Sequence, residues 1–241
     1  METPKRTYPE LISLAVHEFR GPISVVGGYL RMLQRDKDET LSPRHRKLID
    51  AAADSCARLA AIVEELSQLG KLDDGRVPLT RKPLDAFSLV DEVAALVHEA
   101  KEREVTLKVR GLSTGAPMSG DEQRLRQAFT GIFRAIVREK PPNVTVVAER
   151  RIEQVDGRAT AVLIVADEAS VQAAYDREPG PFDEDRGGVG LALPLARRVI
   201  EGHGGRLWAP MPSDGQLPEP GRPSVDPLTR GSAIIFLPIT E

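Results

Sequence analysis

The sequence contains little cysteine, and it has no long hydrophobic run. Cys56 is the one cysteine among 241 residues, which excludes an internal disulfide and a CxxC zinc site. Its simplest interpretation is a small buried hydrophobic residue in a reducing compartment. No apolar run approaches the roughly 20 residues that span a bilayer, and the N-terminal residues lack the apolar core of a signal peptide. We therefore expect a soluble, cytoplasmic protein without direct membrane insertion.

An excess of charge of one sign is also missing. The chain carries 33 Lys and Arg against 36 Asp and Glu, a formal net charge of -3, so nothing electrostatic favours nucleic acid or an anionic membrane as the main partner. With 41% hydrophobic and 29% charged residues, the composition is that of a folded protein of one or two domains.

Helical periodicity dominates the first third of the chain. Apolar residues step by four and three along one face, and they are Ile12, Val16, Phe19, Ile23, Val26, Leu30 and Leu33. Ser42 and Pro43 are typical of an N-cap and a first helical position. The expected apolar stripe of the second helix is Leu48, Ala52, Leu59, Ile62, Leu66 and Leu69. Two such helices alone leave half of each stripe in water, so we expect a homodimer that forms a four-helix bundle.

The segment from Gly70 to Pro83 is rich in Gly, Pro, Asp and Arg, which indicates a linker to a second domain. The pattern there is typical of an α+β fold, with helices on one face of a mixed sheet. The expected elements are helices over residues 87–103, 121–139 and 191–202, strands over 105–110 and 232–238, and a hairpin of strands 144–152 and 159–166 turned at Asp156-Gly157. Six prolines between Trp208 and Gly231 indicate a loop.

His17 and Glu18 form the first chemically suggestive pair. His17 comes one position after Val16, which turns its imidazole away from the apolar stripe toward the surface. Glu18 could accept the Nδ1 proton and leave Nε2 free to attack a phosphoryl group. Pro22 is expected to kink this helix just after the histidine. The alternative is a surface His-Glu pair without function. Only the surrounding sequence can distinguish between these two interpretations.

That surrounding sequence, HEFRGPISVVGGYL from His17 to Leu30, resembles the H box of sensor histidine kinases. Residues 121–127 (DEQRLRQ) resemble the start of the family's N box, residues 187–193 (GGVGLAL) resemble its second glycine box, and SAIIFLP from Ser232 resembles its closing strand. The resemblance implies a dimerisation and phosphotransfer hairpin over residues 1–72 and a GHKL-type α/β-sandwich ATP-binding domain over residues 80–241. It makes His17 the phosphoacceptor and Glu18 its base or orienting carboxylate. ATP and Mg2+ would be the cofactors, and a response-regulator aspartate would receive the phosphoryl group.

The N box departs from the family. Counting along the helix places Gly131 and Ala135 where the family has two asparagines, and a methyl group cannot supply an oxygen to Mg2+. Arg138 occupies a basic position one turn later and could meet a phosphate, although a solvated helix charge is as good an interpretation.

The two glycine boxes differ in how well they match. In the first, Asp167 would accept a hydrogen bond from the adenine amino group, or it could be a turn residue at the end of a strand. Ala169 and Val171 replace its two glycines and are expected to crowd the nucleotide or to forbid positive φ angles. In the second, Gly188 and Gly190 would let backbone N–H groups approach phosphates.

Three further positions complete the site. Arg186 replaces a glycine of the second glycine box and could add a phosphate contact or block one. The expected lid over residues 172–185 is short, with Phe182 as a hinge contact. Gly21 stands where the family's threonine or asparagine positions the water that dephosphorylates the regulator, which predicts weak phosphatase activity.

These substitutions leave alternatives to an active histidine kinase. One is a degenerate pseudokinase or a histidine phosphotransferase with little or no ATP binding, and another is a structural dimerisation module that does not need His17. The remaining histidines are given no chemistry, since His203 is best explained as part of a helix stop, and His45 and His98 have no partner pattern and are expected to be solvated.

Overall fold

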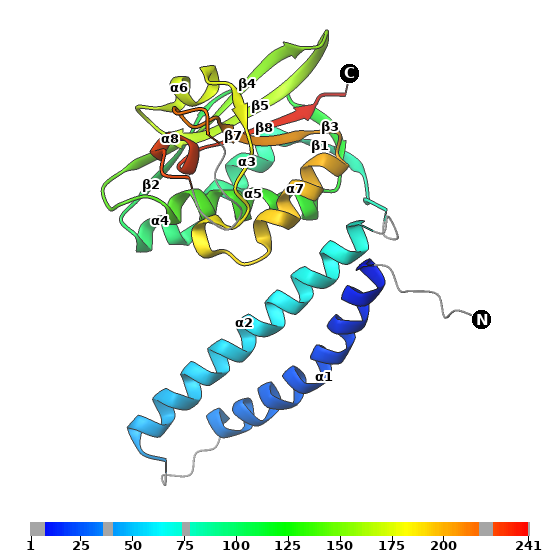
Figure 1. The fold of residues 1–241 in the computed structure, drawn as a ribbon, viewed down its shortest axis with the longest axis vertical. Helices are drawn as coiled ribbons and strands as arrows, with labels where there is room; N and C mark the ends of the chain where they lie inside the picture. Colours follow the sequence, from blue (N-terminus) through cyan, green and yellow to red (C-terminus); the bar gives the residue numbers. More distant parts are fainter. Residues whose placement is uncertain (1–7, 36–40, 74–77, 217–223, 241) are drawn as a thin grey trace, which may run out of the picture. The chain divides into compact units, whose positions relative to one another are not determined.

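The computed structural model describes residues 8–35, 41–73, 78–216 and 224–240. The chain divides into two compact units, Met1–Pro78 and Leu79–Glu241, and each is described by itself. The first unit contains two long helices, α1 (Tyr8–Arg35) and α2 (Pro43–Asp73) (Figure 1). None of the helices that the structure describes is both long and apolar enough to cross a membrane.

The two helices form an antiparallel hairpin. The backbone N–H of His45 donates to the Ser42 hydroxyl at 3.3 Å, which confirms the expected N-terminal cap of α2. Near the other end of α2, Arg20 pairs with Glu64 at 2.8 Å and donates to Ser67 at 3.3 Å. These contacts set the register of α1 against α2.

The apolar stripe expected on α2 is only partly covered by α1. Leu69 is buried and Ile62 and Leu66 are half-buried, whereas Leu48, Ala52 and Leu59 are exposed. The buried residues of α2 also include Cys56, Val63, Ser67 and Gly70. Cys56 is a free and buried thiol, which confirms the expectation that it is a small buried residue. A heptad stripe is wider than the strip that one neighbouring helix covers, so the two-helix hairpin buries only one side of it.

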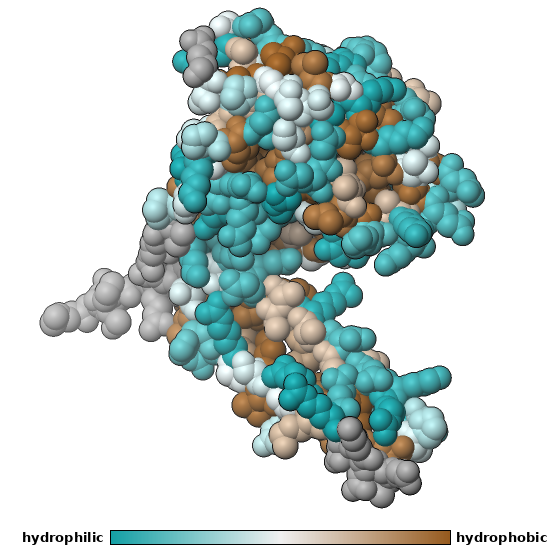
Figure 2. Space-filling view, turned by 180° about the vertical axis from the view of Figure 1, so that it is seen from behind, coloured by the Kyte–Doolittle hydropathy of each residue, from teal (hydrophilic) through white to brown (hydrophobic). Residues whose placement is uncertain are grey.

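The other side of the stripe forms an exposed apolar face on the hairpin. Its members are Leu11, Leu14, Phe19, Val25, Val26, Tyr29, Met32 and Leu33 on α1, with Leu48 and Leu59 on α2. Figure 2 shows hydrophobic residues at the surface of this unit, interspersed with polar ones. An apolar face of this extent is unusual for a helix that functions alone in water.

The second unit contains a mixed sheet with the strand order β2-β4-β5-β8-β7-β6 in the part of the chain that the structure describes, and a small sheet that pairs β1 with β3. β2 and β4 are parallel, and the other pairs are antiparallel. The strands are β1 (Lys82–Asp85), β2 (Thr106–Gly111), β3 (Pro117–Gly120), β4 (Thr145–Val155), β5 (Arg158–Asp167), β6 (Pro179–Gly180), β7 (Arg206–Pro210) and β8 (Ala233–Pro238). The helical segments are α3 (Ala86–Ala95), α4 (His98–Glu102), α5 (Glu122–Arg138), α6 (Val171–Asp176), the short 3-10 turn η1 (Arg186–Gly188), α7 (Ala192–Gly202) and α8 (Pro227–Arg230).

The central hairpin follows the sequence prediction. Asp156 and Gly157 both have positive φ angles, 52° and 75°, as a two-residue turn between β4 and β5 requires. The turn sets the register by pairing Val155 with Arg158.

Helices cover both faces of the sheet, so the expectation of helices on one face is wrong. Val162, Ile164 and Ala166 of β5 pack with Val171 and Ala174 of α6 in one buried cluster. α5 and α7 cover the opposite face, and Figure 1 shows them and α6 on opposite sides of the sheet. The near-continuous burial along β5 follows from this double cover.

Three element boundaries also differ from expectation. The helix expected over 87–103 is two helices, because the chain turns at Leu96 and Val97. The linker expected from Gly70 begins later, since α2 continues to Asp73, and residues 74–77 lie outside the described residues. Most of β7 and all of α8 fall within the expected proline-rich loop, of which residues 217–223 are not described. Prolines suit both elements, at the end of an edge pairing and at the first position of a helix.

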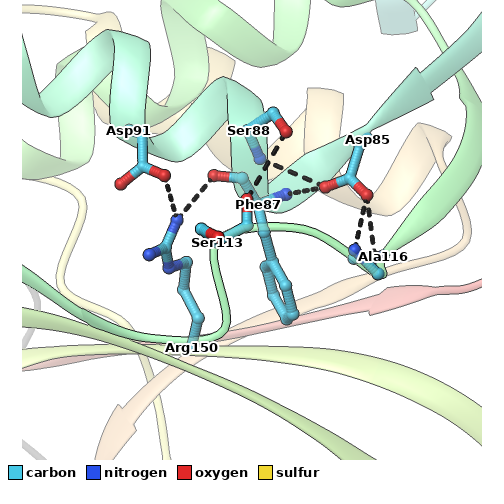
Figure 3. Close-up of polar contacts among 8 residues, drawn as sticks. Asp85, Phe87, Ser88, Asp91, Ser113, Ala116 and Arg150 are labelled. Atoms are coloured by element: carbon cyan, nitrogen blue, oxygen red, sulfur yellow. Dashed lines mark hydrogen bonds and ion pairs between the residues drawn. The ribbon is translucent and has the colours of Figure 1, made fainter.

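A polar network secures α3 against the sheets (Figure 3). One oxygen of Asp85 accepts from the N–H groups of Phe87 and Ser88 at 2.9 and 3.1 Å, and the other accepts from Gly115 and Ala116 at 2.7 and 3.1 Å. Burial acts to raise the pKa of Asp85, but these four N–H groups together lower it. Beside this cap, the buried Arg150 of β4 donates to the Phe87 carbonyl and to Asp91.

Candidate functional site

His17 and Glu18 lie on α1, and both side chains are exposed beside the buried Val16. The ion pair of Arg20 with Glu64 holds this part of α1 against α2. α1 continues through Pro22 without a break, and Figure 1 shows its axis changing direction along its course. The imidazole is therefore presented to solvent from a helix that is fixed on its other side.

A cavity of about 810 Å³ lies in the second unit, at the C-terminal ends of α5 and β5. Its lining is unusually rich in charge, with four basic and two acidic side chains. The charged residues are Arg103, Arg138, Lys140, Arg230, Glu139 and Asp167, and the wall also includes Pro141, Gly187, Ser224, Val225, Pro227 and Gly231. Its volume is within the range of pockets that bind small molecules, and it brings together Asp167, Arg138 and the glycine-rich segment around η1.

Asp167 does not face the cavity alone. The Nζ atom of Lys140 lies 2.6 Å from its Oδ1 atom, and the lysine side chain is 6% exposed. The position expected to read an adenine amino group is therefore already engaged by a buried ammonium group. Lys140 was not identified from the sequence, although it lies only two residues after Arg138, the last residue of α5.

The glycine-rich segment adopts a backbone that glycine favours. Gly187, Gly188 and Gly190 have φ angles of 69°, 57° and 69°, in the left-handed region. Nη1 of Arg138 donates to the carbonyl oxygens of Gly188 at 3.0 Å and Gly187 at 3.5 Å. Arg138 therefore holds the loop by its carbonyl groups, and the N–H of Gly187 donates to Glu139 at 2.8 Å.

The two positions where the family has asparagines are covered by neighbouring segments of the chain. A Cβ atom on Gly187 would lie 2.6 Å from the Cα atom of Ala135, so the loop rests directly on α5. One turn earlier, a Cβ atom on Gly131 would lie 3.2 Å from Ala192 at the start of α7. Across the described residues, no group of three or more His, Cys, Asp or Glu side chains lies where it could hold a metal ion. The residues present do not fit a Mg2+ ion bound through α5.

The two residues that replace glycines in the first glycine box lie in different environments. Ala169 is exposed, whereas Val171 is buried in the cluster that packs α6 against the sheet. The expected lid is in part regular structure, because its first residues belong to α6 and Gly180 pairs with Ala209 in β7. Val171 thus contributes to the core beside the sheet, and the expectation that it crowds a nucleotide stays a prediction.

Arg186 is directed at α8. Its guanidinium group is 3.8 Å from the centre of the Phe182 ring and donates to the carbonyl oxygens of Thr229 and Arg230 at 3.2 and 2.7 Å. Burial lowers the pKa of Arg186 to about 9, and the nearby charges of Asp183 and Glu139 only partly offset this effect. The structure thus gives Arg186 a third role, in which it ties the glycine-rich segment to α8.

His203 has a structural role, as expected of a helix end, and a partner that the sequence did not reveal. Its ring is buried, with Nδ1 at 2.7 Å from the Val199 carbonyl oxygen and Nε2 accepting from the Asp121 N–H at 2.9 Å. It joins the end of α7 to the cap of α5. His45 and His98 are exposed.

The comparisons with known proteins agree with this arrangement. Residues 10–75 match the family model of the His Kinase A (phospho-acceptor) domain. The sensor protein GacS of Pseudomonas syringae pv. syringae is 26% identical over 216 residues, which cover 84% of this chain and 23% of GacS. The chain spans about a quarter of the length of the first curated relatives that it matches.

Solved structures show the same fold. Full-length ShkA, crystallised in complex with AMPPNP, has a TM-score of 0.65 at 21% identity and covers 97% of this chain and 47% of its own. The histidine kinase ThkA, crystallised in complex with the response regulator protein TrrA, has a TM-score of 0.53 at 20% identity and covers 96% of this chain and 61% of its own. The helical hairpin and the mixed α/β domain of this chain thus have the fold of these two proteins. This chain is similar to the sensor histidine kinases, and its residues 10–75 match the phospho-acceptor domain of the His Kinase A type.

Proposed function

We propose that this chain is the core of a two-component histidine kinase, in which His17 receives a phosphoryl group from ATP and passes it to an aspartate of a response-regulator receiver domain. The observation that carries the proposal is the exposed His17-Glu18 pair within the matched phospho-acceptor domain. The likeness to ThkA, which was crystallised with a response regulator protein, supports this class of partner. The proposed site of action is the cytoplasm.

The chemistry needs a nucleophile and a proton acceptor. With the Nδ1 proton of His17 held by the Glu18 carboxylate, Nε2 attacks the γ-phosphorus. A P–N bond forms as the P–O bond to the β-phosphate breaks, and ADP leaves. In the second step the receiver carboxylate attacks the same phosphorus and His17 is regenerated. The protein's own contribution is positioning and charge neutralisation. Arg138 and the glycine-rich segment are the groups proposed for this role, and Asp167 is proposed to position the adenine ring.

The two parts of the chain have separate proposed roles. Residues 1–72 would form the dimerisation and phosphotransfer hairpin, and residues 80–241 the nucleotide-binding domain. The exposed apolar face of α1 and α2 supports a homodimer, because pairing two hairpins through this face would remove it from water.

The test is phosphorylation of the full chain with γ-labelled ATP and Mg2+. We expect label that is lost in acid and stable in alkali, as a phosphohistidine is, and that disappears in His17→Ala. His45→Ala is the matched control, because His45 is an exposed histidine of the same hairpin. Label that persists in His17→Ala would contradict the proposal.

A second candidate is a histidine phosphotransferase that does not use ATP. It is favoured by the packing of Gly187 on Ala135 and by the Lys140–Asp167 ion pair, which together engage both ends of the nucleotide site. In that case ATP gives no label, but a receiver domain phosphorylated by acetyl phosphate transfers its phosphoryl group back to His17. Absence of both reactions would leave a structural dimerisation module.

A further inference from the structure

The carboxylate of Glu139 lies at the centre of the contacts that hold the glycine-rich segment. Glu139 is the C-cap residue directly after α5, and its side chain is 10% exposed. Oε1 accepts the N–H of Gly187 at 2.8 Å, and Oε2 pairs with the guanidinium group of Arg230. One buried carboxylate therefore binds both the loop and the end of α8.

Basic side chains surround the same loop. Arg138 donates to the carbonyl oxygens of Gly187 and Gly188, and its other nitrogen lies 3.5 Å from Glu99. Arg186 is 2% exposed, and its Nε and Nη2 atoms are buried without a hydrogen-bond partner within the described part of the chain. Burying a guanidinium group without a hydrogen-bonded acid is costly. The nearby charges of Asp183 and Glu139 offset the burial of Arg186 only in part, so the basic groups around the loop are incompletely balanced.

A backbone N–H beside guanidinium groups is an arrangement that binds phosphate in proteins. Here the group bound by that N–H is a carboxylate of the chain itself. We infer that Glu139 is an internal anion that holds the phosphate position of the glycine-rich loop, so that a phosphate-bearing ligand enters only by displacing it. The inference rests on the proposed function, in which this loop belongs to a nucleotide site.

Two consequences follow from this occupancy. The wild-type chain binds ATP weakly, because the ligand must expel a carboxylate that already has two strong partners. The affinity also changes little when Mg2+ is removed, since Gly131 and Ala135 offer no oxygen to the metal. Removing the carboxylate leaves the N–H of Gly187 and the guanidinium group of Arg230 without the acid that they share, and this converts a filled anion position into an empty one.

The experiment is titration calorimetry of the full chain with ATP and with inorganic pyrophosphate, each with Mg2+ and with EDTA. Glu139→Ala is expected to bind both ligands at least about tenfold more tightly than the wild type, the change that one hydrogen bond to a charged group supplies. Glu139→Gln should gain less, because its amide oxygen still accepts from Gly187 while the negative charge is gone. Glu92→Ala is the matched control, since it removes a carboxylate of α3 that is paired with an arginine of α5, Arg126, and it should change nothing.

Pyrophosphate is included because it carries the phosphate groups without the base. A gain in affinity for ATP but not for pyrophosphate would place the effect at the adenine base and overturn the inference. Affinities of Glu139→Ala and Glu139→Gln within twofold of the wild type would also overturn it. If Glu139→Ala does not fold, as judged by circular dichroism, the nearly isosteric Glu139→Gln decides the matter. Repeating the titration in His17→Ala separates this inference from the proposed function, because the binding gain does not need His17 whereas the labelling does.

Discussion

The ammonium group of Lys140 lies 2.6 Å from the carboxylate of Asp167, which joins the end of α5 to the end of β5. The lysine is almost fully buried, and the aspartate is partly exposed to the cavity. The pair therefore serves stability first, and any ligand that uses Asp167 has to share it with Lys140.

Neutralising Asp167 should destabilise the second unit. In Asp167→Asn the buried ammonium group loses its counter-charge, and we expect the free energy of unfolding to fall by about 3 kcal/mol. Urea denaturation measures this value. The double variant Asp167→Asn, Lys140→Met removes both charges and should regain most of the loss, so equal stabilities of the single and double variants would contradict the role of the pair.

Restoring the family's residue on α5 should not restore a metal site. The Cβ atom of Ala135 is fully buried beneath Gly187, so Ala135→Asn overfills this contact and should lower the free energy of unfolding by about 1–3 kcal/mol. We expect no Mg2+-dependent labelling beyond that of the wild type. Gln127→Asn, on the exposed side of the same helix, measures the helix-propensity cost alone. A stable Ala135→Asn variant with new Mg2+ dependence would show that the loop moves readily.

Gly21 is expected to affect a different activity, the dephosphorylation of the regulator. It is exposed on α1, and a Cβ atom there would meet nothing within 4 Å, so threonine fits without rearrangement. Because the resemblance places a water-positioning threonine or asparagine here, the wild type should dephosphorylate its regulator slowly and Gly21→Thr several-fold faster. Gly28→Thr is the control, since Gly28 also lies on α1 with open space around it. Equal rates for the wild type and Gly21→Thr would refute this assignment.

His203 should make stability depend on pH. Burial lowers the pKa of its imidazole, although the hydrogen bond to Val199 acts in the opposite direction. As the pH falls below about 6.5, the unfolded chain binds a proton that the folded chain does not, so the free energy of unfolding decreases from pH 7 to pH 5, by up to about 1.4 kcal/mol for each unit of pKa difference. Urea denaturation at both pH values should show a smaller difference in His203→Gln than in the wild type. The exposed His98 provides the control, since His98→Gln should leave the difference unchanged.

The exposed apolar face of the hairpin should be a self-association surface. Val26 is 51% exposed on this face, and a buried unpaired carboxylate would be incompatible with a paired hairpin. Val26→Glu should therefore sediment as a monomer where the wild type sediments as a dimer. Ser13→Glu, an exposed polar position on the same helix, tests whether added charge alone has this effect. A wild type that is monomeric at every concentration would contradict the bundle.

The elements that could be predicted from the sequence are those with a local cause. The cap formed by Ser42, the turn at Asp156-Gly157 and the amphipathic α5 depend on neighbours within a few residues. β7 was missed because it is short and ends in proline, and its strand character comes from pairing with β8 and β6. The sequence also did not reveal that α6 covers the second face of the sheet. The apolar residues of β5 are nearly continuous, so their pattern does not show which helix lies on which face.

The residues of the candidate site could likewise be predicted only in part from the sequence. The motifs located His17, Asp167, Arg138 and the glycines. Glu139 and Lys140 were missed because their partners, Arg230 and Asp167, lie far away in the sequence and become neighbours only when the chain folds. A side chain's charge can be read from its letter, but its counter-ion cannot.

By itself, the sequence determined that His17 stands one position beyond a buried valine on a long helix, because helical periodicity depends on the backbone alone. Only the tertiary structure decided that the glycine-rich segment rests on Ala135 and that the carboxylate of Glu139 accepts the N–H of Gly187. Close packing and ion pairing depend on distances between segments that are remote along the chain, and no local pattern records them.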